Sequence, residues 1–537
     1  MTAGKYANLR ELLEQQVERY RDKPFLFVES DERVFTYGEF DREVNRLAAL
    51  LAALGVRKGD RVSLYLTNSA EYFIAYFACF KLGAWAGPVN ALLKPQEIEF
   101  IVSNSEASVV LTQPDLYDNL AAVRDRLPLV RHVAVASGQW SVVSEESSGQ
   151  WPVASGQKEA AGDASARAIE NEKEPPPDSQ QLATDPWSLT ADDEAVIIYT
   201  SGTTGKPKGV LLTHGNLLTN AREIAAWLQL TEDDRSLMIM PLFHVNALMT
   251  TGLAALWAGG SVVLAPRFSA SRHWQTISQY GVTYFGSVAT MLSRLNHSYP
   301  EGVPAELDTS RLRFALCGSA PVPVEVLKTY EARFACPVIE GYGLSESTCR
   351  ATFNPIDGNR RPGSVGLPIG NEMNVFDDGD NELPPFQVGE IVLRGANLLK
   401  GYYQNEAATR QAFRSGWFHT GDLGYRDDEG FYYVVDRKSD MIIRGGENIY
   451  PREIDEVLYQ HPKVKDAATV GVADELYGEE VKSFVVLRDG CQASEEEIIA
   501  HCRAHLADYK CPKSVAFLDD IPKGPTGKLL KRELAKQ

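Results

Sequence analysis

The stretch AVIIYTSGTTGKPKGVLLTHGNL, residues 195–217, decides the fold. Its β-branched start predicts a strand over 195–200, its apolar second half predicts a strand over 209–213, and a helix is expected from about residue 214. The segment between the strands is rich in glycine, hydroxyl and lysine side chains. Such glycines let backbone N–H groups approach an anion, while hydroxyls and lysines add donors and charge. A triphosphate-binding turn is therefore predicted from Thr200, Ser201, Gly202, Thr203, Thr204, Gly205, Lys206 and Lys208.

This turn differs from the common phosphate-binding loop. GTTGK lacks the four-residue gap of the G-x-x-x-x-G-K-[ST] pattern, and Pro207 stands where that pattern needs serine or threonine. A flexible Ser/Gly turn without function is the alternative. Such a turn would not need a threonine pair followed by two lysines, so the sequence favours a phosphate site of another kind.

The elements on either side predict an α/β fold. Helices are expected over 9–20, 40–54 and 71–83, and the last of these lies between strands at 60–66 and 83–90. A strand, helix and strand in this order are typical of a parallel sheet. Similar signals run from 192 to about 436, and the last hundred residues form a separate small unit. We therefore expect a large N-terminal domain of stacked α/β sheets, residues 1–436, and a small mobile α+β C-terminal domain, residues 437–537.

Composition excludes several classes of protein. The chain has 537 residues, 44% of them hydrophobic and 23% charged, which is typical of globular proteins. A net charge of −18 argues against nucleic-acid binding, which needs clustered lysine and arginine. Seven scattered cysteines without a C-x-x-C pair indicate a reducing compartment and predict neither a zinc site nor a disulfide framework. Charges interrupt the first 23 residues, so no signal peptide is expected, and a cytoplasmic location is predicted.

Residues 236–266 carry no formal charge and are long enough to span a bilayer. Pro241, His244, Asn246, two threonines and three glycines break this stretch into short apolar pieces. It is therefore expected to form a buried helix and a strand, with no transmembrane segment.

Residues 141–185 have a different character. They contain nine acidic and three basic residues and the run PPP. Low hydrophobicity with excess charge cannot offset the entropy of ordering, so an exposed insertion or mobile loop is expected. A docking segment for a partner is the alternative reading.

Four further segments carry side chains suited to a site. PLFHVNAL, 241–248, places His244 among apolar residues, where a core histidine is the alternative. CGSAPVP, 317–323, is a small-residue turn after a strand, the place where open α/β sheets bind ligands. EGYGLSEST, 340–348, flanks Tyr342 with glycines that would admit a flat purine, and Glu346 offers the oxygen ligand that Mg²⁺ prefers. The long segment 416–455 contains GDLG, VVDRK and GGENIYP.

YTSGTTGKPKGV resembles the signature of the adenylate-forming superfamily, which includes acyl-CoA synthetases, aryl-CoA ligases, beetle luciferases and peptide-synthetase adenylation domains. The other segments follow in the order found in that superfamily, so the resemblance covers nearly the whole chain. Within the superfamily, it resembles the AMP-dependent acyl-CoA synthetase or fatty-acid–CoA ligase branch. The resemblance implies ATP, Mg²⁺ and coenzyme A as cofactors and cosubstrates.

The resemblance also implies roles for single residues. It places His244 at the acyl pocket near the path of the thiol, and assigns the metal to Glu346 and Thr203. The adenine would lie along Gly318, Ala320, Pro321 and Tyr342. Glu340, Gly341, Gly343 and Ser345 are expected to bind the nucleotide with them. Asp422 would accept both ribose hydroxyls, and Arg437 would contact ribose and phosphate.

The terminal unit receives its roles in the same way. Asp436 falls at the hinge of the family, Gly445 and Gly446 match a loop that approaches the pantetheine arm, and Lys528 matches the adenylation lysine. Lys531 and Arg532 are expected to be solvated charges. The predicted catalytic set is therefore Lys528, Thr203, Glu346 and His244.

These assignments predict an AMP-forming acid–thiol ligase. A carboxylate would react with ATP to form an acyl-adenylate and diphosphate, and coenzyme A would then displace AMP. A fatty acid is the expected substrate, while an aryl, short-chain or dicarboxylic acid stays open. Candidate residues of the acyl pocket are His244, Val245, Asn246, Ser287, Val288, Met291 and Gly341.

Three alternatives remain. The acyl group could pass to a carrier protein, or it could react with oxygen as in luciferases. The chain could also be a non-catalytic nucleotide-binding scaffold, although binding alone would not need Lys528. A homodimer is left open.

Overall fold

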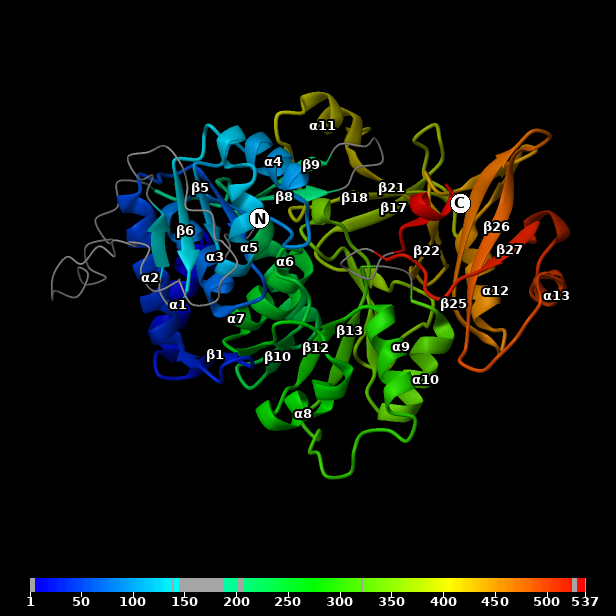
Figure 1. The fold of residues 1–537 in the computed structure, drawn as a ribbon, viewed down its shortest axis with the longest axis horizontal. Coiled ribbons are helices and arrows are strands. Elements are labelled where there is room, and N and C mark those ends of the chain that lie inside the picture. Colours follow the sequence, from blue (N-terminus) through cyan, green and yellow to red (C-terminus); the bar gives the residue numbers. More distant parts are fainter. Residues whose placement is uncertain are drawn as a thin grey trace.

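The computed structural model describes residues 5–137, 140–143, 188–200, 207–319, 322–523 and 529–536. Two large sheets form most of the N-terminal domain (Figure 1). The first sheet has the order β19 (Gly401–Tyr402), β9 (Lys208–Thr213), β8 (Glu194–Thr200), β4 (Trp85–Pro88), β3 (Arg61–Tyr65), β5 (Val109–Thr112), β6 (His132–Ala136) and β7 (Trp140–Val143). The second has the order β14 (Val338–Glu340), β13 (Phe314–Cys317), β12 (Tyr284–Ser287), β10 (Arg235–Met238), β11 (Ser261–Leu264), β1 (Pro24–Val28) and β2 (Val34–Thr36).

A layer of helices separates these sheets. One hydrophobic core joins inward-facing residues of both sheets to the helices α1 (Leu9–Tyr20), α2 (Tyr37–Ala53), α3 (Ala70–Leu82), α6 (His214–Trp227), η2 (Ala247–Leu253) and α7 (Ala254–Ala258). Successive side chains of a strand point to opposite sides of the sheet, so each strand also contributes residues to the core on the outer face. Val109 and Leu111 belong to this inner core, whereas Val110 belongs to an outer one.

Helices also cover the outer faces. The outer core on the first sheet includes α4 (Pro95–Asn104) and α5 (Pro114–Ala121), followed by η1 (Arg124–Arg126). The core outside the second sheet includes α8 (Ala270–Tyr280), α9 (Ala289–Ser298) and α10 (Val324–Phe334). The result is the stacked α/β architecture expected from the sequence.

A third sheet leads toward the C-terminal unit. It contains β17 (Glu372–Phe376), β18 (Gly389–Arg394), β21 (Trp417–Arg426), β20 (Phe413–Arg414) and β22 (Tyr432–Arg437). Short elements beside it are η3 (Ser345–Ser347), β15 (Thr352–Phe353), β16 (Leu367–Pro368) and α11 (Glu406–Ala412).

The small unit, orange to red in Figure 1, is a separate sheet with its own core. Its strands are β24 (Glu447–Ile449), β23 (Ile442–Arg444), β26 (Gly478–Leu487), β25 (Val464–Asp474) and β27 (Ser514–Phe517). α12 (Pro451–Tyr459) and α13 (Glu495–His505) contribute to the core on one face, and α14 (Lys531–Leu534) to the core on the other. η4 (Asp508–Lys510) lies between α13 and β27. The chain passes from the third sheet to this one between Arg437 and Ile442, and the boundary at 436/437 stays a prediction.

Several local expectations are confirmed. α1 spans the helix expected over 9–20, and β3 and β4 are parallel with α3 between them. Residues 236–266 contain most of β10 and all of η2, α7 and β11, in agreement with the prediction of a buried helix and strand. Within the described residues, no helix combines the length and apolar composition needed to cross a bilayer.

The predicted insertion begins later than expected. Trp140–Val143 forms β7, which pairs antiparallel with β6, so residues 141–143 belong to the first sheet. Val142 lies opposite Ala134, and Val143 lies opposite Val133. This short apolar stretch can pair with the edge strand, while residues 144–187 lie outside the described part.

Candidate active site

The predicted triphosphate-binding turn connects the two strands of a hairpin. Thr200 and Lys208 are partners in the antiparallel β8–β9 ladder. The predicted site residues between them, Ser201, Gly202, Thr203, Thr204 and Gly205, lie outside the described residues. The hairpin nevertheless fixes where the segment begins and ends.

Glu346 lies close to one end of this hairpin through a residue that the sequence did not reveal. The Tyr402 hydroxyl donates a hydrogen bond to Glu346 Oε1 at 3.0 Å, and Lys208 Nζ lies 5.0 Å from the centre of the Tyr402 ring. Tyr402 is held there because β19 pairs with β9, where Tyr402 faces Val210. Burial raises the pKa of Glu346. Tyr402 thus contacts both the Glu346 carboxyl group and the Lys208 ammonium, next to the turn predicted to bind phosphate.

Tyr342, Asp422 and Arg437 form a second group of contacts. The Tyr342 hydroxyl donates to Asp422 Oδ2 at 2.6 Å, and Arg437 Nε lies 3.4 Å from Asp422 Oδ1. Asp422 and Arg437 are cross-strand partners in β21 and β22, which explains how residues fifteen positions apart come together. The structure therefore assembles three residues that the resemblance assigned to adenine, ribose and phosphate.

At three of the predicted site positions, glycine is required for a reason different from the access of a purine expected from the sequence. A Cβ at Gly343 would lie 1.8 Å from the Cys349 carbonyl oxygen, and one at Gly341 would lie 2.6 Å from the Thr352 carbonyl oxygen. A Cβ at Gly318 would lie 2.6 Å from the Gly341 carbonyl oxygen. The close approach of the chain to itself already requires glycine at these positions. Access of a purine to Tyr342 stays a prediction; Ala320 and Pro321 lie outside the described residues, and Ser345 begins η3.

His244 lies in the chain segment between β10 and η2. Its ring centroid is 4.4 Å from that of Phe243, and its buried Nε2 has no hydrogen-bond partner among the described residues. Burial lowers the pKa of His244 to about 4, so the imidazole is neutral at pH 7. Nearby, Asn246 Nδ2 donates to Ser319 Oγ at 2.9 Å. A neutral ring nitrogen and a polar pair are thus available beside the predicted acyl pocket.

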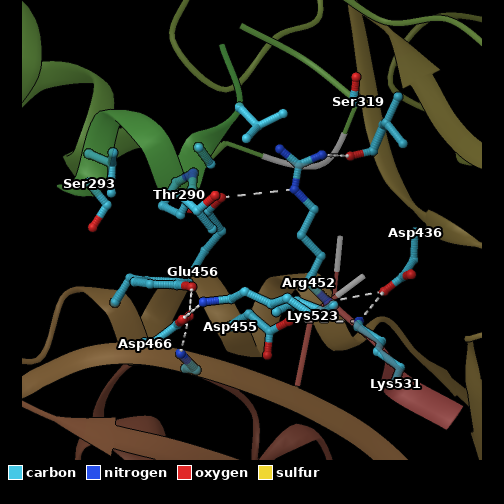
Figure 2. Close-up of a pocket in the computed structure, with 18 of the residues that line it drawn as sticks. Thr290, Ser293, Ser319, Asp436, Arg452, Asp455, Glu456, Asp466, Lys523 and Lys531 are labelled. Atoms are coloured by element: carbon cyan, nitrogen blue, oxygen red, sulfur yellow. Dashed lines mark hydrogen bonds and ion pairs between the residues drawn. The ribbon is translucent and has the colours of Figure 1, made fainter. Parts of the chain in front are cut away.

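A cavity of 630 Å³ joins the two domains at this site (Figure 2). The large domain contributes Val288, Ser319, Glu340, Gly341, Tyr342 and Asp422, and the small unit contributes Arg452, Asp455, Lys523, Leu529 and Lys531. Lys528 lies outside the described residues. Lys523 and Leu529, the described residues on either side of positions 524–528, both line the cavity.

Gly445 and Gly446 lie elsewhere. They form the exposed turn between β23 and β24, with φ of 60° and 91°, a left-handed conformation suited to glycine. Neither glycine is among the described residues that line the cavity. In this orientation, Lys523, Leu529 and Lys531 of the small unit line the cavity, while the predicted pantetheine loop is exposed to solvent.

Lys531 corrects a prediction. A solvated charge was expected, but its ammonium lies 3.8 Å from Asp436 Oδ2 and 3.7 Å from Asp455 Oδ2, and only 19% of its side chain is exposed. Burial of Leu534 holds α14 against the sheet and brings Lys531 to these carboxylates. The side chain of Arg532 lies outside the described part.

Glu340 lines the cavity with a buried Oε2 that has no hydrogen-bond partner among the described residues. Burial raises the pKa of Glu340 from 4.5 to about 8, although the charge of Arg452 opposes this rise. Between about pH 4.5 and 8, the folded protein therefore holds a proton that the unfolded chain has lost. Stability contributed by this group is lost as the pH rises through that window.

We expect Glu340→Gln to reduce the decline of the free energy of unfolding between pH 5 and 8, because glutamine cannot ionise. Denaturant unfolding at several pH values measures this decline, with the exposed Glu306→Gln as control. Equal pH slopes for the wild type and Glu340→Gln would contradict the assignment.

No group of three or more His, Cys, Asp or Glu side chains within the described ranges could hold a metal ion. Mg²⁺ commonly takes one or two protein carboxylates together with phosphate oxygens and water. Glu346 therefore fits a metal that ATP would bring, and Mg²⁺ itself stays a prediction.

Comparison with known proteins agrees with this geometry. The AMP-binding enzyme family matches residues 13–403, and the C-terminal domain of AMP-binding enzymes matches residues 453–528. The chain is 36% identical to the sulfoacetate–CoA ligase of Cupriavidus necator over 534 residues, which cover 98% of this chain and 97% of the relative. It is 34% identical to the long-chain-fatty-acid–CoA ligase of Bacillus subtilis, covering 98% and 94% of the two chains. ATP-bound MatB from Rhodopseudomonas palustris has a TM-score of 0.84 at 28% identity, with 98% of each chain covered.

A large α/β domain followed by a small C-terminal domain is the architecture of adenylate-forming CoA ligases. The chain belongs to the AMP-binding enzyme family. The predicted fold class and the prediction of an AMP-forming acyl-CoA synthetase are thereby confirmed.

Proposed function

We propose that this protein joins a carboxylic acid to coenzyme A in two steps. A carboxylate oxygen attacks the α-phosphorus of ATP, which forms an acyl-adenylate and releases diphosphate. The thiol sulfur of coenzyme A then attacks the acyl carbon, and AMP leaves. The observation that supports this proposal is the shared cavity, which is lined by Tyr342, Asp422 and Arg437 together with Lys523 and Leu529.

The first step brings two anions together, so its barrier is largely electrostatic. Fixed cations and oriented N–H groups lower such a barrier because they cost little reorganisation during the reaction. Lys208 and Lys528 supply positive charge, and Asp422 with Tyr342 and Arg437 holds the nucleoside. Glu346 and Thr203 would hold Mg²⁺, which supplies further positive charge to the phosphates.

The second step needs a thiolate and a path for it. Burial lowers the pKa of His244 to about 4, so its imidazole is neutral at pH 7 but a weak base. We therefore assign His244 to the thiol side of the acyl carbon as an uncharged lining group and not as the proton acceptor. Gly445 and Gly446 are exposed in the present orientation. We therefore propose that the small unit rotates before this step and brings their turn to the cavity.

The acid is the least determined part of the proposal. A fatty acid is supported by the apolar pocket residues Val245, Val288 and Met291 and by similarity to a long-chain-fatty-acid–CoA ligase. A short polar acid is the second candidate. The Asn246–Ser319 pair at the pocket and similarity to a sulfoacetate–CoA ligase favour it.

A panel of fatty, aryl, short-chain and dicarboxylic acids tests both candidates. We expect acid-dependent AMP release and thioester formation with coenzyme A, and little release with a phosphopantetheinyl carrier protein. Carrier-dependent AMP release would instead support the carrier alternative. If no acid in the panel caused AMP release with either coenzyme A or the carrier protein, the proposed function would be contradicted. A cytoplasmic location and a homodimer stay predictions.

A further inference from the structure

The side chain of Lys531 crosses from one domain to the other. Lys531 begins α14, which packs on the small sheet through the fully buried Leu534. Asp436, in contrast, belongs to β22, a strand of the third sheet in the large domain. The ion pair between Lys531 and Asp436 therefore lies where the chain passes from one sheet to the other.

The carboxylate of Asp436 has several hydrogen-bond donors and a cation around it (Figure 2). Its Oδ2 accepts the Arg452 backbone N–H at 3.1 Å and lies 3.8 Å from Lys531 Nζ. Its Oδ1 accepts the Arg437 backbone N–H at 2.8 Å. Arg452 and Lys531 both belong to the small unit, so one carboxylate of the large domain binds two segments of the small one.

The contact is largely shielded from solvent. The side chain of Asp436 is 7% exposed and that of Asp455 is 12% exposed. Burial lowers the pKa of Lys531, but the charges of Asp455 and Asp436 outweigh burial and raise it. A lysine held between two shielded carboxylates is screened little by salt, unlike a surface pair.

Lys531 also borders the segment that contains Lys528. Lys523 and Leu529 pair as an isolated antiparallel bridge, and the Leu530 N–H donates to the Pro522 carbonyl at 2.9 Å. Lys523 forms an ion pair with Asp466 inside the small unit. Lys531, two residues beyond the bridge, ties the same segment to the large domain.

We propose that Lys531 is a positioning residue whose ion pair with Asp436 holds the small unit in the orientation that serves acyl-adenylate formation. Asp455 moves with Lys531, because α12 and α14 belong to the same unit. When the unit rotates, Lys531 keeps Asp455 and leaves Asp436. This inference rests on the proposed two-step function, but its structural part can be measured without activity.

The activity test compares the two half-reactions in the full-length protein. We expect Lys531→Met to lower acid-dependent ATP–diphosphate exchange by about tenfold, because the productive orientation becomes a minor population. Thioester formation from supplied acyl-adenylate should be unchanged or faster. Lys531→Arg should restore exchange, because it keeps the charge. Lys463→Met is the matched control, because Lys463 pairs with Glu497 at 2.7 Å within the small unit.

The structural test measures the distance between the domains by electron-spin labels. Glu301→Cys and Glu475→Cys place labels on exposed positions of the two domains, in a Cys491→Ser background because the other six native cysteines are buried. In the labelled protein that keeps Lys531, we expect one main distance between the two labels. With Lys531→Met, we expect a second distance or a broader distribution. If wild-type protein shows no exchange, the proposed function fails, while a Lys531-dependent distance change still supports the ion-pair role. An unchanged distance distribution, or equal losses in both half-reactions, would overturn the inference.

Discussion

Lys528→Ala is expected to lower the rate of acyl-adenylate formation by roughly 10²- to 10³-fold, the typical cost of removing one group that stabilises transition-state charge. The attacking carboxylate and the α-phosphate are both anions, so a missing ammonium raises the barrier of this step directly. Lys523 and Leu529, on either side of residues 524–528, line the same cavity as Tyr342 and Asp422. Single-turnover formation of acyl-adenylate measures the loss.

The second half-reaction separates this role from a general loss of structure. Thioester formation from supplied acyl-adenylate should largely survive in Lys528→Ala, because the proposed rotation of the small unit moves the segment that contains Lys528 away before this step. Lys536→Ala, at an exposed position near the C-terminus, is the control and should retain both steps. Equal loss of both steps in Lys528→Ala would contradict a role confined to adenylation.

Glu346→Gln is expected to raise the Mg²⁺ concentration needed for half-maximal adenylation by about tenfold or more, because an amide is a weaker ligand than a carboxylate for a hard cation. Glutamine keeps the size of the side chain and can still accept from the Tyr402 hydroxyl, which lies 3.0 Å from Glu346 Oε1. A titration of initial rate against Mg²⁺ at saturating ATP measures the change.

Tyr402→Phe distinguishes a metal role from a loss of local order. It removes the hydrogen bond to Glu346 but keeps the ring beneath Lys208, so only a small change in the Mg²⁺ requirement is expected. An unchanged Mg²⁺ titration in Glu346→Gln would remove Glu346 from the predicted metal site.

Local sequence patterns predicted the parts of this molecule that depend on neighbouring residues. The helix at 9–20, the β3–α3–β4 unit and the strands around the phosphate segment follow from apolar spacing and β-branched runs. The meeting of Asp422 with Arg437 was expected only by resemblance, and the antiparallel ladder of β21 and β22 supplies its physical reason.

Contacts between distant segments were not predictable in this way. Tyr402 reaches Glu346 because β19 pairs with β9, which lies almost two hundred residues earlier, and no local spacing encodes that register. Lys531 was expected in solvent because a lysine in a basic tail is usually a solvated charge. Its burial depends on how α14 packs on the small sheet and on the position of Asp436 near the end of β22. The raised pKa of Glu340 likewise follows from tertiary burial.

The most direct test of the central claim is the exchange of labelled diphosphate into ATP, measured with Mg²⁺ and a panel of acids before any coenzyme A is added. Reversible adenylate formation predicts label in ATP that depends on the acid, is lost in Lys528→Ala and needs no thiol. Thioester formation without any such exchange, or exchange that appears only with coenzyme A, would contradict an acyl-adenylate as the first product.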